Sequence, residues 1–153
     1  MNDIERFINL PEKRARSEVR AYGIDLGTTN STVAEVSWVP GQAPVCRIME
    51  IEQPTVMGSY TAPLVPSVVG ILPDGRVWVG EGAKRIRATM QKYGLVVEKN
   101  LFYETKNDIG LKKTYYRAPS EFNHASKIAG CILAFLYSAL GSTRDGELGG
   151  VSV

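Results

Sequence analysis

The sequence predicts an α/β fold in which a mixed sheet opens with an antiparallel meander and a smaller α/β subdomain contains one long helix. Three observations support it. Strand-like alternation dominates the first half of the chain, a Pro-Asp-Gly turn joins two later strand patterns, and an apolar helix pattern follows near the end. A chain of 153 residues is long enough to bury about 70% of its unfolded surface within one domain.

The strands are predicted from runs of β-branched and aromatic residues bounded by turn residues. Five segments show this pattern: 22–26, 32–38, 45–51, 65–71 and 76–80. The first three form the meander, because residues 40–44 contain two prolines and a glycine that favour a turn. The last two flank Pro73-Asp74-Gly75 and predict a second hairpin.

Two helices are predicted. The first begins at Gly82, ends at Gly94 and places apolar residues on one face: Ala83, Ile86, Met90 and Tyr93. The second spans residues 120–140, with Ser120 as its N-cap. Its second half, CILAFLYSAL, is apolar nearly all round, which predicts burial on more than one side.

Composition excludes several classes of function. A net charge of +2 without a basic, aromatic stripe does not favour nucleic acid, and no apolar run is long enough to span a membrane. Cys46 and Cys131 are predicted to be buried free thiols, which indicates a reducing, cytoplasmic compartment. Residues 1–20 mix charges of both signs around Pro11 and are predicted to form a flexible leader.

The stretch YGIDLGTTNST, residues 22–32, contains the most informative chemistry. Asp25 lies inside a strand pattern between two glycines, and an unpaired carboxylate there needs water, a cation or hydrogen-bond donors above it. Gly27 permits a tight turn, and the amides of residues 27–30 can converge on an anion. A carboxylate beside an anion-binding turn is typical of a magnesium–phosphate site. The alternative is an ordinary polar turn in which Asp25 caps a local amide.

The same residues resemble a known family. GIDLGTTNS closely resembles the first phosphate motif of the 70-kilodalton heat-shock chaperones, members of the actin-like ATPase superfamily with a ribonuclease-H-like fold. The resemblance extends through VPSVVGILPDGRVWVGEGAKR, NLFYETKNDIG and the long helix pattern. It covers about residues 21–153, which would form the amino-terminal lobe of an actin-like ATPase domain that ends before the second phosphate loop.

Residue roles follow from this resemblance at matching positions. It implies that Asp25 contacts Mg²⁺ through its water shell and that Gly27, Thr28, Thr29 and Asn30 wrap the β- and γ-phosphates of ATP. It also implies that Lys106 points at the γ-phosphate and helps to orient the attacking water, a role suited to a cation near developing phosphoryl charge. The alternative for Lys106 is a solvated surface lysine.

The implied function is the ATP-binding part of a chaperone that uses ATP hydrolysis to bind and release unfolded polypeptide, with co-chaperones as partners. The chain would supply half of the nucleotide cleft, so we expect it to bind ATP weakly, if at all, and not to turn it over. Two alternatives stay within the superfamily: an actin-like filament protein and a carbohydrate kinase. A small stand-alone binding module is a third.

Other residues have simpler interpretations. His124 is predicted to be structural because no ligand or catalytic partner lies at a suitable spacing. Trp38 and Trp78 fall in strand patterns and are predicted to lie in the core or on a sheet face. Three basic residues form a predicted solvated helix face that could also contact a nucleotide or a partner protein: Lys84, Arg85 and Arg87.

Overall fold

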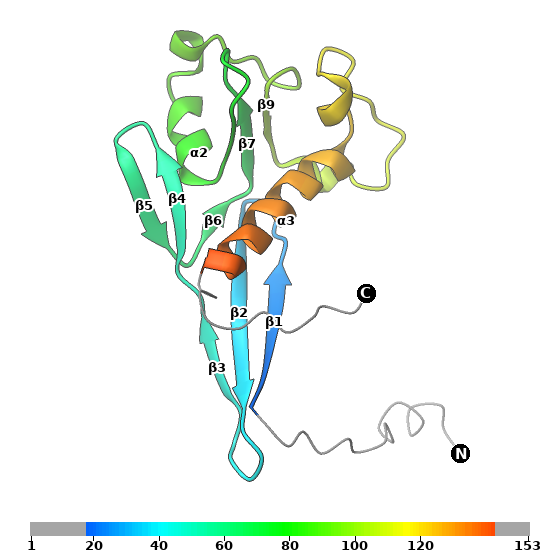
Figure 1. Ribbon diagram of the computed structural model, residues 1–153. Helices are drawn as coiled ribbons and strands as arrows, with labels where there is room; N and C mark the ends of the chain where they lie inside the picture. Colours follow the sequence, from blue (N-terminus) through cyan, green and yellow to red (C-terminus); the bar gives the residue numbers. More distant parts are fainter. Residues whose placement is uncertain (1–17, 143–153) are drawn as a thin grey trace, which may run out of the picture.

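The structure, a computed structural model, describes residues 18–142. A narrow sheet extends from one end of the molecule, and a long helix, α3 (Ala125–Ser142), crosses in front of its upper part (Figure 1). Shorter strands, α2 and several turns make up the upper part of the molecule. The predicted leader lies almost wholly outside the described residues.

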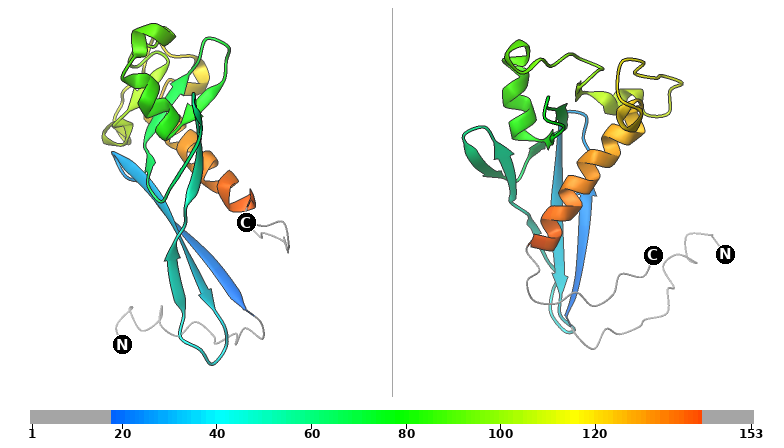
Figure 2. Two further views of the ribbon diagram at one scale, coloured as in Figure 1. Left: turned by 90° about the vertical axis from the view of Figure 1, so that its left-hand side faces the viewer. Right: turned by 45° about the horizontal axis from the view of Figure 1, so that its top comes forward.

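The narrow sheet confirms the predicted meander. It is formed by β1 (Val19–Asp25), β2 (Asn30–Trp38) and β3 (Val45–Ile48), paired antiparallel in that order. Its far end projects beyond the rest of the fold (Figure 2). The alternation predicted for β2 is also present, because Val33 and Glu35 are buried while their neighbours are partly exposed.

The prediction for the third strand was wrong at its end. β3 stops at Ile48, and Ile51 begins a new strand, β4 (Ile51–Thr55), which pairs with β5 (Gly58–Ala62) in a hairpin that the sequence analysis missed. The turn is closed by Thr55, whose hydroxyl donates to the Gly58 carbonyl over 3.0 Å, and by Gly58 at φ 115°. Pro54 within β4 weakens the strand signal in the sequence.

The second predicted hairpin is confirmed. β7 (Val68–Ile71) pairs with β8 (Val77–Val79) across the Pro73-Asp74-Gly75 turn and with β9 (Leu101–Tyr103) on its other edge. A short strand, β6 (Val65–Pro66), pairs with the start of β2. All ladders between these strands are antiparallel, and the only described parallel pairing is the bridge between Val97 and Leu101, so the predicted mixed sheet is not seen in residues 18–142.

Both helix predictions were too long. α2 (Glu81–Arg87) ends after two turns, and the chain continues in a 3-10 helix, η1 (Met90–Tyr93), before Gly94 in the left-handed conformation. Ala83 and Ile86 are buried as predicted, but Met90 is exposed because the helix has already ended. In the second case Ser120 caps no α-helix, since residues 120–122 form a 3-10 turn and α3 begins at Ala125.

The apolar half of α3 is buried on one side only. Ile132, Leu136 and Leu140 face the core, whereas Leu133 and Tyr137 are exposed. The expectation of burial on several sides was therefore wrong for residues 18–142. Spacings of four residues keep each set on its own stripe of the helix, and the two stripes are about 100° or less apart.

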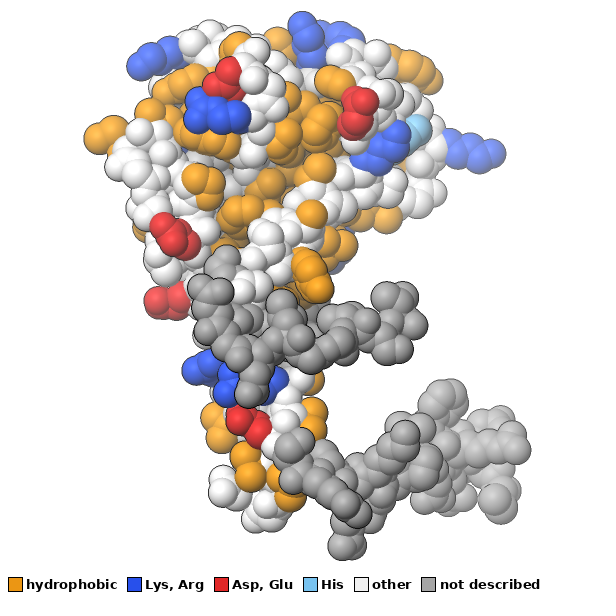
Figure 3. Space-filling view, in the orientation of Figure 1, with side chains coloured by type: hydrophobic (Ala, Val, Ile, Leu, Met, Phe, Trp, Pro, Cys, Tyr) orange, Lys and Arg blue, Asp and Glu red, His pale blue; other side chains and the backbone are white. Residues whose placement is uncertain are grey.

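Two apolar clusters hold the fold together. The larger joins α3 to β2, β4 and β7 and contains Val33, Ile51, Val69, Ile128 and Leu136. The smaller joins α2 to β7 and the loop before β9 through Ile86, Leu95 and Leu101. Figure 3 shows hydrophobic side chains along α3 and the strands beside it in the upper part of the molecule. The core is thus concentrated where the strands, α2 and α3 meet.

Several single residues have a clear position. Both cysteines are free, as predicted, but Cys46 is exposed on β3 rather than buried, because neither face of that strand is covered by the described residues. Trp38 and Trp78 are half-buried on their strands.

Glu35 is buried, and its pKa is lowered by a hydrogen bond with Tyr22 and by Arg47, whose guanidinium lies 2.7 Å away. That pairing explains how a carboxylate occupies the inner face of β2.

Candidate phosphate-binding site

The turn between β1 and β2 is unusually tight. A Cβ added to Gly27 would lie 2.0 Å from the Asn30 carbonyl oxygen, so only glycine fits at this position. Within residues 18–142, the amides of Gly27, Thr28 and Thr29 donate no hydrogen bond to the protein. Unpaired backbone amides in a tight turn are the donors of an anion-binding nest.

Ser67 fixes this turn from the segment that joins β6 to β7. Its hydroxyl donates to the Gly27 carbonyl over 2.8 Å, and its amide donates to the Thr29 carbonyl over 2.8 Å. The hydroxyl of Ser31 lies 3.0 Å from that of Ser67. These contacts engage the carbonyls of the turn on one side. Sequence reasoning missed this role, although a Pro-Ser pair before a buried strand was its visible signal.

Asp25 is the last residue of β1 and is exposed. It lies opposite Thr32 in the ladder, and among the described residues its carboxylate has no hydrogen bond or ion pair. Its side chain is therefore free to meet a cation or water from solvent. The alternative of Asp25 as a local cap has no support in these contacts.

Lys106 lies on the 3-10 helix η2 (Thr105–Asp108), far along the chain from the turn. It lines a small pocket together with Gly27, Thr28 and Leu26, which we call the Lys106 pocket. The volume is about 10 Å³, which is room for about one water molecule. Lys106 is exposed, and its ammonium group makes no ion pair or hydrogen bond with the residues that the structure describes.

A polar cluster anchors η2 through Asp108. The Tyr115 hydroxyl donates to Asp108 over 2.9 Å, and Lys113 contacts both Asp108 and Glu98 at 2.8 Å. The Lys113 hydrogen bond lowers the pKa of Asp108, while burial and the bond to Asp108 raise the pKa of Tyr115. Asp108 thus remains ionised and Tyr115 protonated near neutral pH, so the anchor of η2 persists there.

The other two turn residues face a different pocket. Thr29 and Asn30 line a space of about 200 Å³ together with Lys84 and Arg87 of α2, which we call the Arg87 pocket. Thr28 lines both pockets, and Asp25 lines neither. The structure therefore brings Lys106 beside Gly27 and Thr28, brings Lys84 and Arg87 beside Thr29 and Asn30, and leaves Asp25 on the adjoining surface.

Another hollow lies away from these residues. It has a volume of about 590 Å³ between the β4–β5 hairpin and the second half of α3. Glu50 and Glu52 are its ionisable lining residues, and no cation is among the described residues that line it. We favour the turn as the functional site, because an anion needs donors and positive charge rather than volume alone.

The remaining findings concern His124, metal-binding side chains and membrane-spanning helices. The Nδ1 atom of His124 lies 3.1 Å from the Lys113 carbonyl, a contact that ties the start of α3 to the preceding loop. No group of three metal-binding side chains occurs within residues 18–142. A search of the same residues finds no helix able to cross a membrane.

Comparison with known proteins supports the resemblance to the heat-shock chaperones. This chain is similar to a DnaK chaperone. It is 37% identical over 105 residues to the chaperone protein DnaK of Stenotrophomonas maltophilia (strain R551-3), which is 69% of this chain. The chain spans 13% of the length of that DnaK, and no family model matches it. The similarity supports a relation to the 70-kilodalton heat-shock chaperones and, at the family level, to chaperone-type ATPases.

Proposed function

We propose that the turn at residues 27–30, Asp25 and Lys106 form one wall of an ATP-binding site in a heat-shock-type chaperone. Residues 21–153 would belong to the amino-terminal lobe of an actin-like ATPase domain, with residues 1–20 as a leader. The observation that carries the proposal is the Lys106 pocket, where a lysine from η2 meets the glycine turn between β1 and β2. The DnaK similarity supports the same reading.

The residues present fit a magnesium-bound nucleotide. Gly27 sits where any Cβ would collide, the adjoining amides have no protein acceptor among the described residues, and Asp25 is exposed. Amides and Lys106 would bind the β- and γ-phosphates, and Asp25 would hold Mg²⁺ through its water shell. When bound, Mg²⁺ would supply positive charge that offsets the charge of the phosphates.

Lys106 would act on the γ-phosphate and the attacking water. Its ammonium group has no carboxylate partner in residues 18–142, so its full charge is available to stabilise developing negative charge. The anchoring of η2 through Asp108 would limit the freedom of the lysine backbone. In the whole protein, ATP hydrolysis would then change the affinity for unfolded polypeptide, with co-chaperones as further partners.

A nuclear magnetic resonance titration with MgATP tests the proposal on the chain itself. We expect the amide signals of Gly27, Thr28 and Thr29 to shift with an affinity weaker than micromolar, because the described residues form one wall only. Lys106→Ala should weaken binding about tenfold, the effect of losing one charge-assisted hydrogen bond. Lys112→Ala is the matched control, because Lys112 is exposed and lines neither pocket.

The ATP titration is also carried out with and without Mg²⁺. With Asp25→Asn, the affinity for ATP should no longer respond to Mg²⁺, and in the whole protein the turnover of ATP should fall. Shifts that gather around the large hollow at Glu50 and Glu52 would contradict the proposal. Equal effects of the Lys106 and Lys112 variants would also contradict it.

A further inference from the structure

The Arg87 pocket adjoins the Lys106 pocket at Thr28, which lines both. The turn residues Thr28, Thr29 and Asn30 form one side of it, and Lys84 and Arg87 of α2 contribute two positive charges. Glu104, just before η2, is the only carboxylate in its lining, so the ionisable lining residues sum to a charge of +1. The pocket therefore has a positive balance and several hydroxyl and amide donors.

Arg87 is held in place without being neutralised. Its guanidinium carbon lies 4.4 Å from the centre of the Tyr103 ring, a cation–π contact that restrains the group. No carboxylate among the described residues pairs with Arg87. A guanidinium stacked on a ring keeps its N–H groups at its edge, where they can bind two oxygens of one anion.

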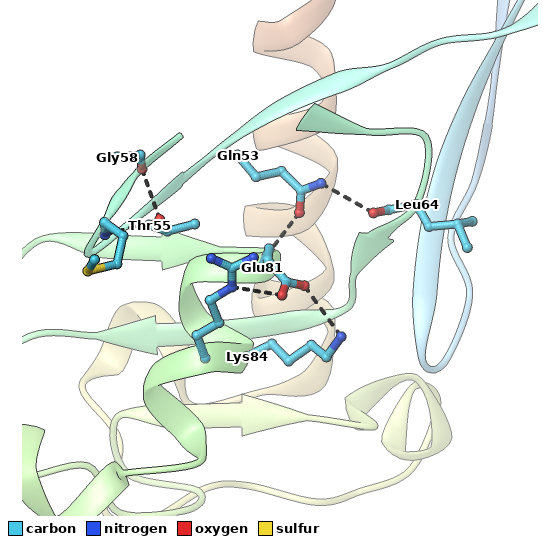
Figure 4. A network of polar contacts seen from close by, with 8 residues as sticks. Gln53, Thr55, Gly58, Leu64, Glu81 and Lys84 are labelled. Atoms are coloured by element: carbon cyan, nitrogen blue, oxygen red, sulfur yellow. Dashed lines mark hydrogen bonds and ion pairs between the residues drawn. The ribbon is translucent and has the colours of Figure 1, made fainter. Parts of the chain in front are cut away.

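The neighbouring cations on α2 differ from Arg87. Glu81 binds Arg85 at 2.9 Å and Lys84 at 3.4 Å, and Figure 4 shows the ion pair with Lys84 beside the Gln53 network. Arg85 lines no part of the pocket and lies over the ring of Tyr60. Arg87 is thus the cation of α2 that faces the pocket and keeps its charge unpaired within residues 18–142.

We infer that the Arg87 pocket is a second subsite for a phosphate group, in addition to the site at Lys106. Its volume of about 200 Å³ is below the range of about 300–1,000 Å³ that holds a drug-sized ligand, so it suits a phosphate rather than a whole nucleotide. Because Thr28 lines both pockets, a phosphate chain can contact both sides of the turn. The inference deepens the proposed function. It rests on that function only where the phosphate chain contacts the Lys106 pocket.

Titration of the chain with inorganic tripolyphosphate tests the subsite, read from the amide shifts of Thr29 and Asn30. Arg87→Gln should weaken tripolyphosphate binding about tenfold, because one bidentate charged contact is lost. Arg85→Gln removes the same charge from the same helix but should change the affinity less than about twofold. Glu104→Gln should strengthen binding several-fold, because it removes the one negative charge in the lining.

Further probes identify the source of the phosphate. ATP should shift the same amides as tripolyphosphate, whereas adenosine should leave them unchanged, and inorganic phosphate should bind more weakly than tripolyphosphate. Equal losses for Arg87→Gln and Arg85→Gln would reduce the effect to net charge and overturn the subsite. An affinity unchanged by Arg87→Gln would overturn it too. Thermal unfolding of each variant shows whether the fold is retained, and Arg87→Lys, which keeps the charge without the planar group, should bind with intermediate affinity.

The two proposals can fail separately. If Lys106→Ala leaves ATP binding unchanged while Arg87→Gln removes tripolyphosphate binding, the ATP site at Lys106 is wrong and the Arg87 subsite stands. If the reverse holds, the Arg87 subsite is wrong and the proposed function stands.

Discussion

At the scale of single residues, the turn depends on Gly27 and Ser67 in different ways. Gly27 makes the close approach of the Asn30 carbonyl possible, and Ser67 engages the carbonyls of Gly27 and Thr29. The amides of Gly27, Thr28 and Thr29 have no acceptor among the described residues. The geometry that suits an anion is therefore held by a serine from another segment of the chain.

Ser67→Ala should lower both stability and nucleotide binding. It removes the donor to the Gly27 carbonyl and the partner of the buried Ser31 hydroxyl, and leaving such groups unsatisfied costs about 1–3 kcal/mol. Chemical denaturation measures the first effect, and the MgATP titration measures the second. Ser59→Ala, at an exposed position on β5, is the control and should have neither effect. A stable Ser67→Ala chain with an unchanged turn would contradict this role.

At the scale of elements, α2 is placed by close backbone contact with the β4–β5 hairpin. A Cβ added to Gly82 would lie 2.1 Å from the Pro54 carbonyl oxygen and 3.0 Å from the Trp78 ring. This approach sets the height of α2 over the sheet, and with it the position of Lys84 and Arg87. Neither the hairpin nor this contact was predicted, because both depend on segments that meet only after folding.

Gly82→Ala and Gly130→Ala should have opposite effects on stability. The first forces α2 away from Pro54 and should cost about 1–3 kcal/mol, as overpacking does. The second lies in α3 with open space around it, and should stabilise the helix by up to about 1 kcal/mol because alanine has the higher helix propensity. Thermal unfolding compares the two. A destabilising Gly130→Ala or a neutral Gly82→Ala would show that the packing differs from that described.

At the scale of the whole molecule, stability is unevenly distributed. Both apolar clusters lie where α2, α3 and the shorter strands meet, whereas every residue of β3 is exposed and β1 is nearly so. Val45 and Ile48 on β3 are 62% and 64% exposed, which is high for apolar strand residues. The candidate site lies between these regions, at the end of β1 and beside the core.

Hydrogen exchange should be faster in the exposed strands than in the core. Amides of β3 and of the end of β2 near Trp38 should exchange faster than those of β7 and the buried face of α3, because fewer buried contacts oppose their local opening. Exchange measured by mass spectrometry on peptides from the two regions tests this. Equal protection in both regions would contradict it.

The sequence by itself determined the meander, the hairpin around Pro73-Asp74-Gly75, and the composition of the turn after Asp25. These features are set by alternation and by turn residues next to each other in the chain, so local physics is enough to predict them. The resemblance to the heat-shock chaperones also pointed to Lys106. Helix ends and the burial of Cys46, Leu133 and Tyr137 were predicted wrongly, because they depend on which faces receive a neighbour.

Only the tertiary structure decided which distant residues meet at the turn. Ser67, Lys106 and Arg87 come from three separate elements, and no spacing in the sequence indicates that two pockets share Thr28. The physical reason is that contacts between distant segments are fixed by packing, here by α2 on the β4–β5 hairpin and by α3 on η2. The sequence supplied the chemistry of the turn, and packing supplied the charges around it.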